Sequence, residues 1–519
     1  MQIFHYGTDE LTASVALDIA RGNTQGVIGQ EARERILQSA AHVQTIVERG
    51  QTVYGINTGF GSLCTTIISA EDTQLLQENI LKSHSVGVGD PIDSEIAKLM
   101  LILKVHSLAQ GFSGIALTTL ERMIWHIEQD LIPVVPCQGS VGASGDLAPL
   151  AHLCLPLIGL GQLQVAGQTM KTADYFSKHG LTPIELGPKE GLALINGTQF
   201  IAAHAVVVLD RLYNCLSVAD VIGAMMIEAL MGSVKPFEAA LHAIRPFPGN
   251  AHVAHRVRTL LQDSEILDSH ANCDRVQDPY SLRCIPQVHG TSRAAWAHLK
   301  TQLEIELNAV TDNPILLSAE ETISGGNFHG QPLALPLDYV ALAAAELGNI
   351  SDRRIYLSLE GKVEGLPQLL MKNTGINSGF MLPQYTSAAL VSENKSLVFP
   401  ASADSIPTSL GQEDHVSMGS ISGRKALQII TNLEQVLAIE LLCAAQAFDF
   451  RRPLKSGPIL EAHHAYIRSQ VDHATADRVF AHDIATAHQI IASRKLSEIT
   501  RETGGDLLVS PHHETFETY

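Results

Sequence analysis

The sequence predicts a mainly α-helical protein built around long, buried helices. Between residues 335 and 357 apolar side chains recur near helical spacing, which predicts one long helix. Between residues 426 and 448 they surround the helix on nearly every face, which predicts a central helix packed on all sides. Segments 99–108 and 380–397 have the same character, although Pro383 should start or kink the second. Strand-like alternation of apolar and polar residues is scarce and short.

Three parts follow one another along the chain, but no Pro- or Ser-rich linker separates them cleanly. Residues 1–200 are rich in loops punctuated by glycine, and helical signals dominate there only after the first fifty residues. Residues 201–450 carry the long helices. Residues 451–519 are more polar and predict shorter helices, and we expect residues 504–519 to fray.

The composition excludes several classes of partner. Only 17% of the 519 residues are charged, against about 25% in an average soluble domain, so we expect part of the surface to be covered by subunit contacts. The 35 Lys and Arg against 54 Asp and Glu leave a net charge of −19, which would repel nucleic acid or an anionic membrane. Two stretches without charge, 147–170 and 191–209, are interrupted by Pro, Gly, Asn or Gln, which indicates buried interior and no membrane span.

The cysteines and the N-terminus indicate a cytoplasmic protein. Seven cysteines are odd in number, widely scattered and contain no C-x-x-C pair, which argues against a disulfide framework or a structural zinc site. The first residues lack a basic segment followed by an apolar run, so we expect no secretory signal. The 23 histidines form no H-E-x-x-H or other ordered ligand spacing, and we predict that no metal is required.

The segment PCQGSVGASGDLAPL, residues 136–150, is the strongest candidate for chemistry. Three glycines remove side chains just before an apolar, helical run. A purely structural interpretation is a glycine-rich turn capped by Ser144 or Asp146. The segment lacks both common phosphate-binding glycine motifs, and it lacks the G-x-S-x-G elbow of serine hydrolases.

A different chemistry is available to Ala143, Ser144 and Gly145. In a tightly bent loop the amide nitrogen of Gly145 can attack the carbonyl carbon of Ala143, because Ala and Gly obstruct this approach least. Loss of two waters, one of them from Ser144, then leaves an exocyclic methylidene on a five-membered ring. Such a group is an electrophile, which no ordinary side chain supplies.

The run GSVGASGDLAPLAH resembles the signature of the aromatic amino acid ammonia-lyases, which form 4-methylidene-imidazol-5-one (MIO) from this tripeptide. Five further segments match in the family's order, and the resemblance covers nearly the whole chain. They are YGINTGFG (54–61), INGTQ (195–199), VQDPYSLRC (276–284), GGNFHG (325–330) and QEDHVSM (412–418). The resemblance implies the long central helix bundle of the histidase/fumarase-like superfamily, a loop-rich N-terminal MIO domain and no external cofactor. It also implies a homotetramer whose active sites are assembled from three chains.

The matching positions imply a set of site residues. As catalytic residues we expect Ala143, Ser144, Gly145, Tyr54, Tyr280 and Glu413; as substrate-binding residues we expect His84, Asn196, Gln277, Arg283 and Phe328. The guanidinium of Arg283 suits the substrate carboxylate, because it offers a planar two-donor fork. The phenols of Tyr54 and Tyr280 suit proton exchange. The amides of Asn196 and Gln277 suit an oxygen that gains negative charge, and Phe328 would supply an apolar wall.

Two positions indicate the substrate. Glu413 and the pair Ser83-His84 resemble the histidine-specific members of the family, and a carboxylate suits an imidazole with N–H donors. We therefore expect elimination of ammonia from L-histidine to give trans-urocanate, the first step of histidine degradation. A tyrosine or phenylalanine ammonia-lyase or a 2,3-aminomutase is the alternative, since Ser-His also occurs in some tyrosine-preferring members. The sequence leaves open which residue is the base and whether the amine or the aromatic ring attacks the methylidene.

Overall fold

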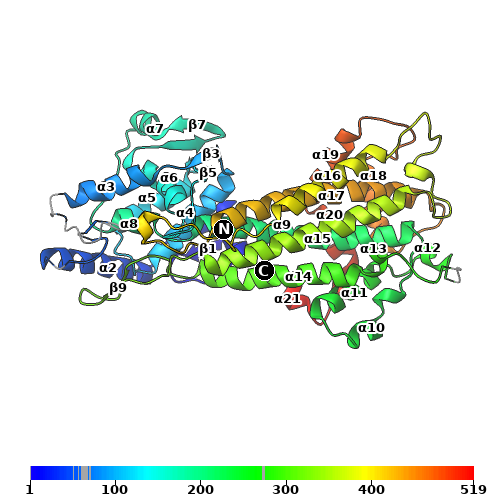
Figure 1. Ribbon diagram of the computed structural model, residues 1–519, viewed down its shortest axis with the longest axis horizontal. Coiled ribbons are helices and arrows are strands. Elements are labelled where there is room, and N and C mark those ends of the chain that lie inside the picture. Colours follow the sequence, from blue (N-terminus) through cyan, green and yellow to red (C-terminus); the bar gives the residue numbers. More distant parts are fainter. Residues whose placement is uncertain (1, 51, 57, 60–67, 69–71, 272–274) are drawn as a thin grey trace.

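The computed structural model describes residues 2–50, 52–56, 58, 59, 68, 72–271 and 275–519 (Figure 1). The molecule is elongated, with a lobe of short helices and strands at one end and a bundle of long helices that runs away from it (Figure 1). The mainly α-helical fold predicted from the sequence is confirmed.

Five long helices form the bundle: α9 (Gln199–Ala229), α14 (Ile285–Leu307), α15 (Gln331–Leu359), α16 (Met381–Leu397) and α17 (Gly419–Asp449). The helices predicted at 335–357 and 426–448 lie within α15 and α17, and the one predicted at 380–397 is α16, which begins one residue later. Pro383 falls in the first turn of α16, where its missing N–H costs nothing. α17 packs against α9, α15 and α16, and every residue from Val436 to Phe448 is buried. Apolar residues on all faces of this helix therefore reflect neighbours on all sides.

α15 and α17 are also long and apolar enough, by length and composition, to cross a membrane. Within their most apolar windows, however, 72% and 78% of the residues are buried inside the protein. The core helices of soluble proteins commonly pass the same test, so the apolar character of both helices is accounted for by packing within the bundle.

The lobe is formed by the described residues that precede α9, and a hairpin at residues 315–323 returns to it from the bundle (Figure 1). Its helices are α1 (Ala13–Ala20), α2 (Gln30–Glu48), α3 (Thr73–His84), α4 (Ser94–Ala109), α5 (Leu117–Glu128), α6 (Leu147–Cys154), α7 (Thr172–His179) and α8 (Glu190–Ile195). Helices α1 and α2 lie within the first fifty residues, so the expectation that helical structure dominates only later was wrong. The helix expected at 99–108 is confirmed within α4, which is buried from Leu99 to Ala109.

The strands are short, as predicted, and pair in small sheets. Their bounds are β1 (Gln2–His5), β2 (Thr24–Val27), β3 (Val88–Pro91), β4 (Ile132–Pro133), β5 (Pro136–Gln138), β6 (Gln162–Val165), β7 (Gln168–Lys171), β8 (Ile315–Leu316) and β9 (Thr322–Ile323). β1 pairs with β2 in parallel, and the pairs β3–β5, β4–β6, β6–β7 and β8–β9 are antiparallel. The β8–β9 hairpin belongs to the lobe, because Leu316 N donates to Phe112 O. The domain boundaries expected at residues 200 and 450 stay a prediction.

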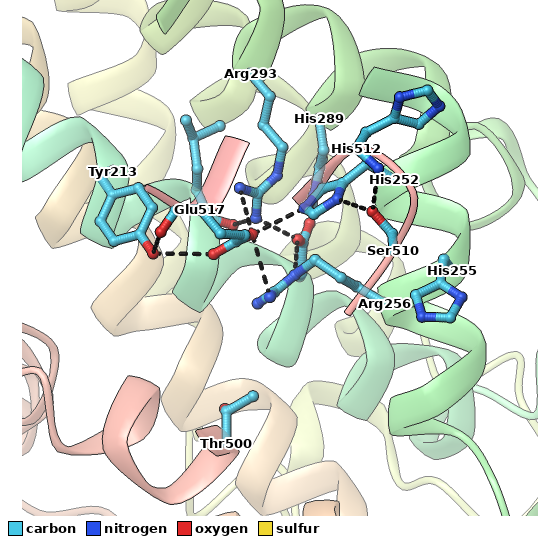
Figure 2. A network of polar contacts seen from close by, with 12 residues as sticks. Tyr213, His252, His255, Arg256, His289, Arg293, Thr500, Ser510, His512 and Glu517 are labelled. Carbon is cyan, nitrogen blue, oxygen red and sulfur yellow. Dashed lines mark hydrogen bonds and ion pairs between the residues drawn. The ribbon is translucent and has the colours of Figure 1, made fainter. Parts of the chain in front are cut away.

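Short helices cover the far end of the bundle: α10 (Ala239–Ala243), α11 (Pro248–Leu260), α12 (Glu265–Asp268), α13 (Tyr280–Arg283), α18 (Pro458–Gln470), α19 (Phe480–Ala492), α20 (Lys495–Gly504) and α21 (His513–Glu517). The expectation that residues 504–519 fray was wrong. Glu517 accepts hydrogen bonds from Arg293 and Tyr213 and lies within 3.2 Å of Arg256 (Figure 2). Phe516 is buried as well. The sequence interpretation missed this because the partners lie more than two hundred residues away.

Candidate active site

The loop that carries Ala143, Ser144 and Gly145 is bent at glycines where a side chain would be strained and crowded. Gly142 and Gly145 have φ values of 67° and 77°, in the left-handed region. A Cβ on Gly145 would lie 2.1 Å from Gly197 O, and one on Gly142 would lie 2.2 Å from Ser417 Oγ. The backbone of Ala143 and Gly145 forms an antiparallel bridge across Ser144. The two residues that would cyclise thus face each other across a tight bend.

Asp146 anchors this loop to the first turn of α9. Its amide N–H donates to Gly197 O at 2.7 Å, and its carboxylate accepts from Ile201 N at 2.9 Å and from Ser140 Oγ at 3.0 Å. Burial raises the pKa of Asp146 to about 7, although the hydrogen bonds to its carboxylate oppose this shift. Asp146 occupies the N-cap position of α6, as the structural interpretation of the sequence allowed, but its side chain makes no capping hydrogen bond there. Its carboxylate accepts instead from Ile201 N in the first turn of α9.

The segment before α17 covers the other side of the loop. Met418 N donates to Val141 O at 3.0 Å, and Ser420 Oγ donates to Ser140 O at 2.6 Å. Val416 and Met418 pack against Ala143 in a small apolar cluster. The QEDHVSM segment and the glycine-rich loop, far apart in the sequence, are therefore joined by hydrogen bonds and apolar contacts.

Glu413 lies directly beside Ser144. Ser144 Oγ donates to Glu413 Oε1 at 3.1 Å, and Thr408 Oγ1 donates to Glu413 Oε2 at 2.8 Å. The two oxygens of one carboxylate are thus held by residues on either side of it. His84, at the end of α3, lines a cavity of about 230 Å³ together with Glu413, Ala143 and Thr408. Burial lowers the pKa of His84, while the Ile80 carbonyl and the charge of Glu413 oppose the shift.

A second, larger cavity of about 600 Å³ also borders the tripeptide. Ala143, Ser144 and Glu413 line it together with Tyr54 and Phe328, as expected from the sequence. His329 and His415, which were not expected, line it too, and their rings stack with centroids 5.7 Å apart. Within the YGINTGFG segment, Asn57, Phe60 and Gly61 lie outside the described residues.

Asn196, at the end of α8, is buried behind the tripeptide. Its Nδ2 donates to Asn313 O at 2.9 Å, while its Oδ1 is buried and has no partner among the described residues. Because a carbonyl oxygen only accepts, this contact fixes which end of the amide is the nitrogen. The sequence interpretation treated the Asn196 amide as a donor. One N–H of its Nδ2 is already used in the bond to Asn313 O, whereas its Oδ1, an acceptor, has no partner among the described residues.

Gln277, Tyr280 and Arg283 form a second group at the opposite end of the chain's bundle (α13 in Figure 1). Arg283 Nη2 donates to Gln277 Oε1 at 2.9 Å, and the guanidinium lies 4.6 Å from the ring centroid of Tyr280, which is 71% exposed. Arg275, just before this group, donates to the carbonyl of Leu230 at the C-terminal end of α9. Asn196 precedes the N-terminal end of the same 31-residue helix, so about 45 Å separates the two groups at about 1.5 Å per residue.

A family model for aromatic amino acid lyases matches residues 11–469. The chain belongs to the aromatic amino acid lyase family. It is 48% identical over 482 residues to a histidine ammonia-lyase of Natranaerobius thermophilus, an alignment that covers 92% of this chain and 95% of the relative. These findings confirm the family that the sequence motifs predicted.

Two solved structures of relatives have the same fold. Histidine ammonia-lyase from Trypanosoma cruzi is 39% identical, with a TM-score of 0.90 over 100% of this chain and 97% of that chain. A tyrosine aminomutase from Streptomyces globisporus is 32% identical, with a TM-score of 0.91 over 97% and 99% of the two chains. The fold is therefore shared by enzymes with different printed activities, and side chains in the site must distinguish them.

Several residues of the site escaped the sequence interpretation. Thr408, Ser140, His329 and His415 have no spacing that singles them out, and Asp146 was considered only as a cap of its own helix. Thr408 and Ser140 contact Glu413 and Asp146, five and six residues away in the sequence, but these contacts depend on how the loops are folded, so the structure identifies them. Among the described residues, no group of three or more His, Cys, Asp or Glu side chains could hold a metal ion.

Proposed function

We propose that this protein is a carbon-nitrogen lyase that eliminates ammonia from L-histidine to give trans-urocanate, the first step of histidine degradation. The observation that carries the proposal is the contact between Ser144 and Glu413, whose carboxylate also lines the cavity with His84. The relatives from Natranaerobius thermophilus and Trypanosoma cruzi carry the name histidine ammonia-lyase. Both kinds of support lead to the same substrate.

We propose that Ala143, Ser144 and Gly145 cyclise to MIO, and the local geometry fits that group. Gly145 has no room for a side chain, and its backbone already faces Ala143 across the bend. The Ser144 hydroxyl, which would leave as water, donates to a carboxylate. The finished ring would supply an electrophile that ordinary side chains lack. No external cofactor is needed for this chemistry.

The residues around the tripeptide suit an amino acid with an imidazole side chain. The Glu413 carboxylate offers acceptors to a substrate N–H or ammonium group, and Thr408 keeps it in place. Because the pKa of His84 is lowered, its imidazole is largely neutral near pH 7 and can exchange a hydrogen bond with the substrate ring. Phe328 and Tyr54 line the larger cavity, and the Tyr54 phenol is of the kind suited to proton exchange with the substrate.

The substrate carboxylate requires a cation. Among the site residues expected from the sequence, that cation is Arg283, which lies in α13 at the far end of the bundle from Ser144. We propose that Arg283, with Gln277 and Tyr280, comes from another copy in a homotetramer with shared active sites. About 45 Å between the two groups in one chain, and the exposure of Tyr280, support this arrangement.

The five cysteines that are described are all free, which is in keeping with a reducing, cytoplasmic location.

Purified protein given histidine, tyrosine and phenylalanine separately tests the substrate. We expect equal amounts of ammonia and trans-urocanate from histidine, and no turnover by the Ser144→Ala variant. Release of ammonia from tyrosine but not histidine, or formation of a β-amino acid, would instead support the ammonia-lyase or aminomutase alternatives.

Co-expression of two inactive variants tests the shared site. Ser144→Ala and Arg283→Ala each destroy one half of the site, so mixed oligomers should regain activity where intact halves from different copies meet. Mixed oligomers that stay inactive, or an active monomer in light scattering, would contradict the proposal.

A further inference from the structure

A buried lysine lies behind the tripeptide, and nothing derived so far uses it. Lys104, in α4, is 1% exposed, and its Nζ donates to the main-chain oxygen of Asn196 at 2.5 Å. Among the described residues, it forms no ion pair with a carboxylate. A lysine so deeply buried is uncommon, because desolvation penalises the charged ammonium. Its retention beside Asn196 therefore requires a reason.

The peptide group between Asn196 and Gly197 connects this ammonium to the tripeptide. Its carbonyl oxygen accepts from Lys104, and its N–H, on Gly197, donates to the carbonyl oxygen of Ser144 at 3.4 Å. A cation on the carbonyl side polarises the whole peptide and makes its N–H a stronger donor. The Ser144 carbonyl would be conjugated with the methylidene, so a stronger donor at its oxygen makes the proposed electrophile more reactive.

A second chain of contacts holds the side chain of Asn196. Asn196 Nδ2 donates to Asn313 O, Asn313 N donates to Asp312 Oδ1 at 2.7 Å, and Asp312 pairs with Lys189 at 2.7 Å. Lys189 and Asp312 are both buried, at 0% and 2% exposure. Lys189 is paired with Asp312, whereas Lys104 donates directly to the Asn196 carbonyl, so Lys104 is the ammonium in contact with the Asn196–Gly197 peptide.

We propose that Lys104 is a positioning residue of the proposed ammonia-lyase reaction, on which this inference rests: its buried ammonium orients and polarises the Asn196–Gly197 peptide toward Ser144 O. Burial lowers the pKa of Lys104 to about 8, against the opposing effects of Asp312 and Cys154, while the charge of Lys189 lowers it further. The ammonium is therefore largely charged near pH 7 and loses its proton as the pH rises through about 8.

The Lys104→Met variant tests the role of the charge, because it keeps the length of the side chain. We expect the peptide that contains residues 143–145 to remain two waters lighter than encoded, kcat for histidine to fall by about 10- to 100-fold, and KM to change little. The absorption band of the ring should move to shorter wavelength, since its carbonyl is less polarised. Lys98→Met is the matched control: Lys98 lies in the same helix but pairs with Asp130 at the surface.

If the methionine variant does not fold, a comparison of the pH dependence of the absorption band in Lys104→Arg and in the wild-type enzyme tests the same inference. In the wild type, the same shift of the band should develop as the pH rises through about 8, whereas arginine should retain the charge and abolish this step. Wild-type kcat and an unmoved band in Lys104→Met, or an identical pH step in Lys104→Arg, would overturn the inference. An unmodified tripeptide in the wild-type protein would refute the MIO proposal itself, which the mass measurement distinguishes.

Discussion

Removing the charge of Glu517 should release the C-terminal residues from the bundle. Two carboxylates, Glu517 and Asp220, and two guanidinium groups, Arg256 and Arg293, form a neutral buried cluster. His252 adds no charge, because burial lowers its pKa to about 4. The Glu517→Gln variant would leave two buried cations facing one anion. Breaking a buried pair in this way costs about 3–5 kcal/mol.

This free energy corresponds to a rise of about two to three and a half orders of magnitude in the population of released tail, at about 1.4 kcal/mol per tenfold change. Hydrogen exchange of the peptide that covers 505–519 measures it, since exchange from a transiently opened segment follows its open population. Glu514→Gln is the matched control, because Glu514 lies in the same helix but is exposed. Equal exchange in Glu517→Gln, Glu514→Gln and the wild type would refute the assignment of the cluster as the anchor.

The pH dependence of this anchor has a definite sign. Burial alone would raise the pKa of Glu517, but the attraction of Arg256 and Arg293 outweighs it and holds the pKa well below its usual range. A depressed pKa stabilises the folded state above the ordinary value near 4.3, and this stabilisation is lost only as the pH falls toward the lower, folded value. The tail of the wild type should therefore remain protected at pH 5.

Three further changes test the site. Gly145→Ala places a Cβ 2.1 Å from Gly197 O at a φ of 77°, so the variant should fold without losing the two waters and show no turnover; a mass two waters lighter than encoded would contradict this. Thr408→Val removes one hydrogen bond to Glu413, worth about 1.5–3 kcal/mol to a charged group, and should lower kcat/KM for histidine by about tenfold or more while Thr408→Ser stays near wild type; equal losses in both would argue against the hydroxyl. Asp146→Asn keeps the size of the side chain, but its amide N–H₂ would face Ile201 N or the Ser140 hydroxyl, so ring formation should slow in a time course of intact mass, and unchanged kinetics would refute the anchoring role.

The long helices were predictable because their signal is local. The periodicity of residues 335–357 and 426–448 depends only on neighbours along the chain, and both segments lie within single helices. The docking of the tail was not predictable, since Glu517 finds Arg256 and Arg293 only after the bundle has formed. The same distinction applies within the site.

Site residues that belong to motifs could be named from the sequence, but their partners could not. The contact of Ser144 with Glu413 joins positions 269 residues apart, and only the resemblance to a family brought the two together beforehand. Lys104 belongs to an apolar helix with no motif, so its contact with Asn196 follows from the packing of α4 beneath that residue. Spacing alone also gives no indication that Asn196 and Arg283 lie at opposite ends of one helix.

The mass of the proteolytic peptide that contains residues 143–145 tests the central claim most directly. If Gly145 N attacks the Ala143 carbonyl and Ser144 loses its hydroxyl, this peptide from the purified wild-type protein is two waters lighter than encoded, and the same peptide from Ser144→Ala is not. A wild-type peptide with its full encoded mass would contradict the proposed electrophile and, with it, the proposed route to ammonia elimination.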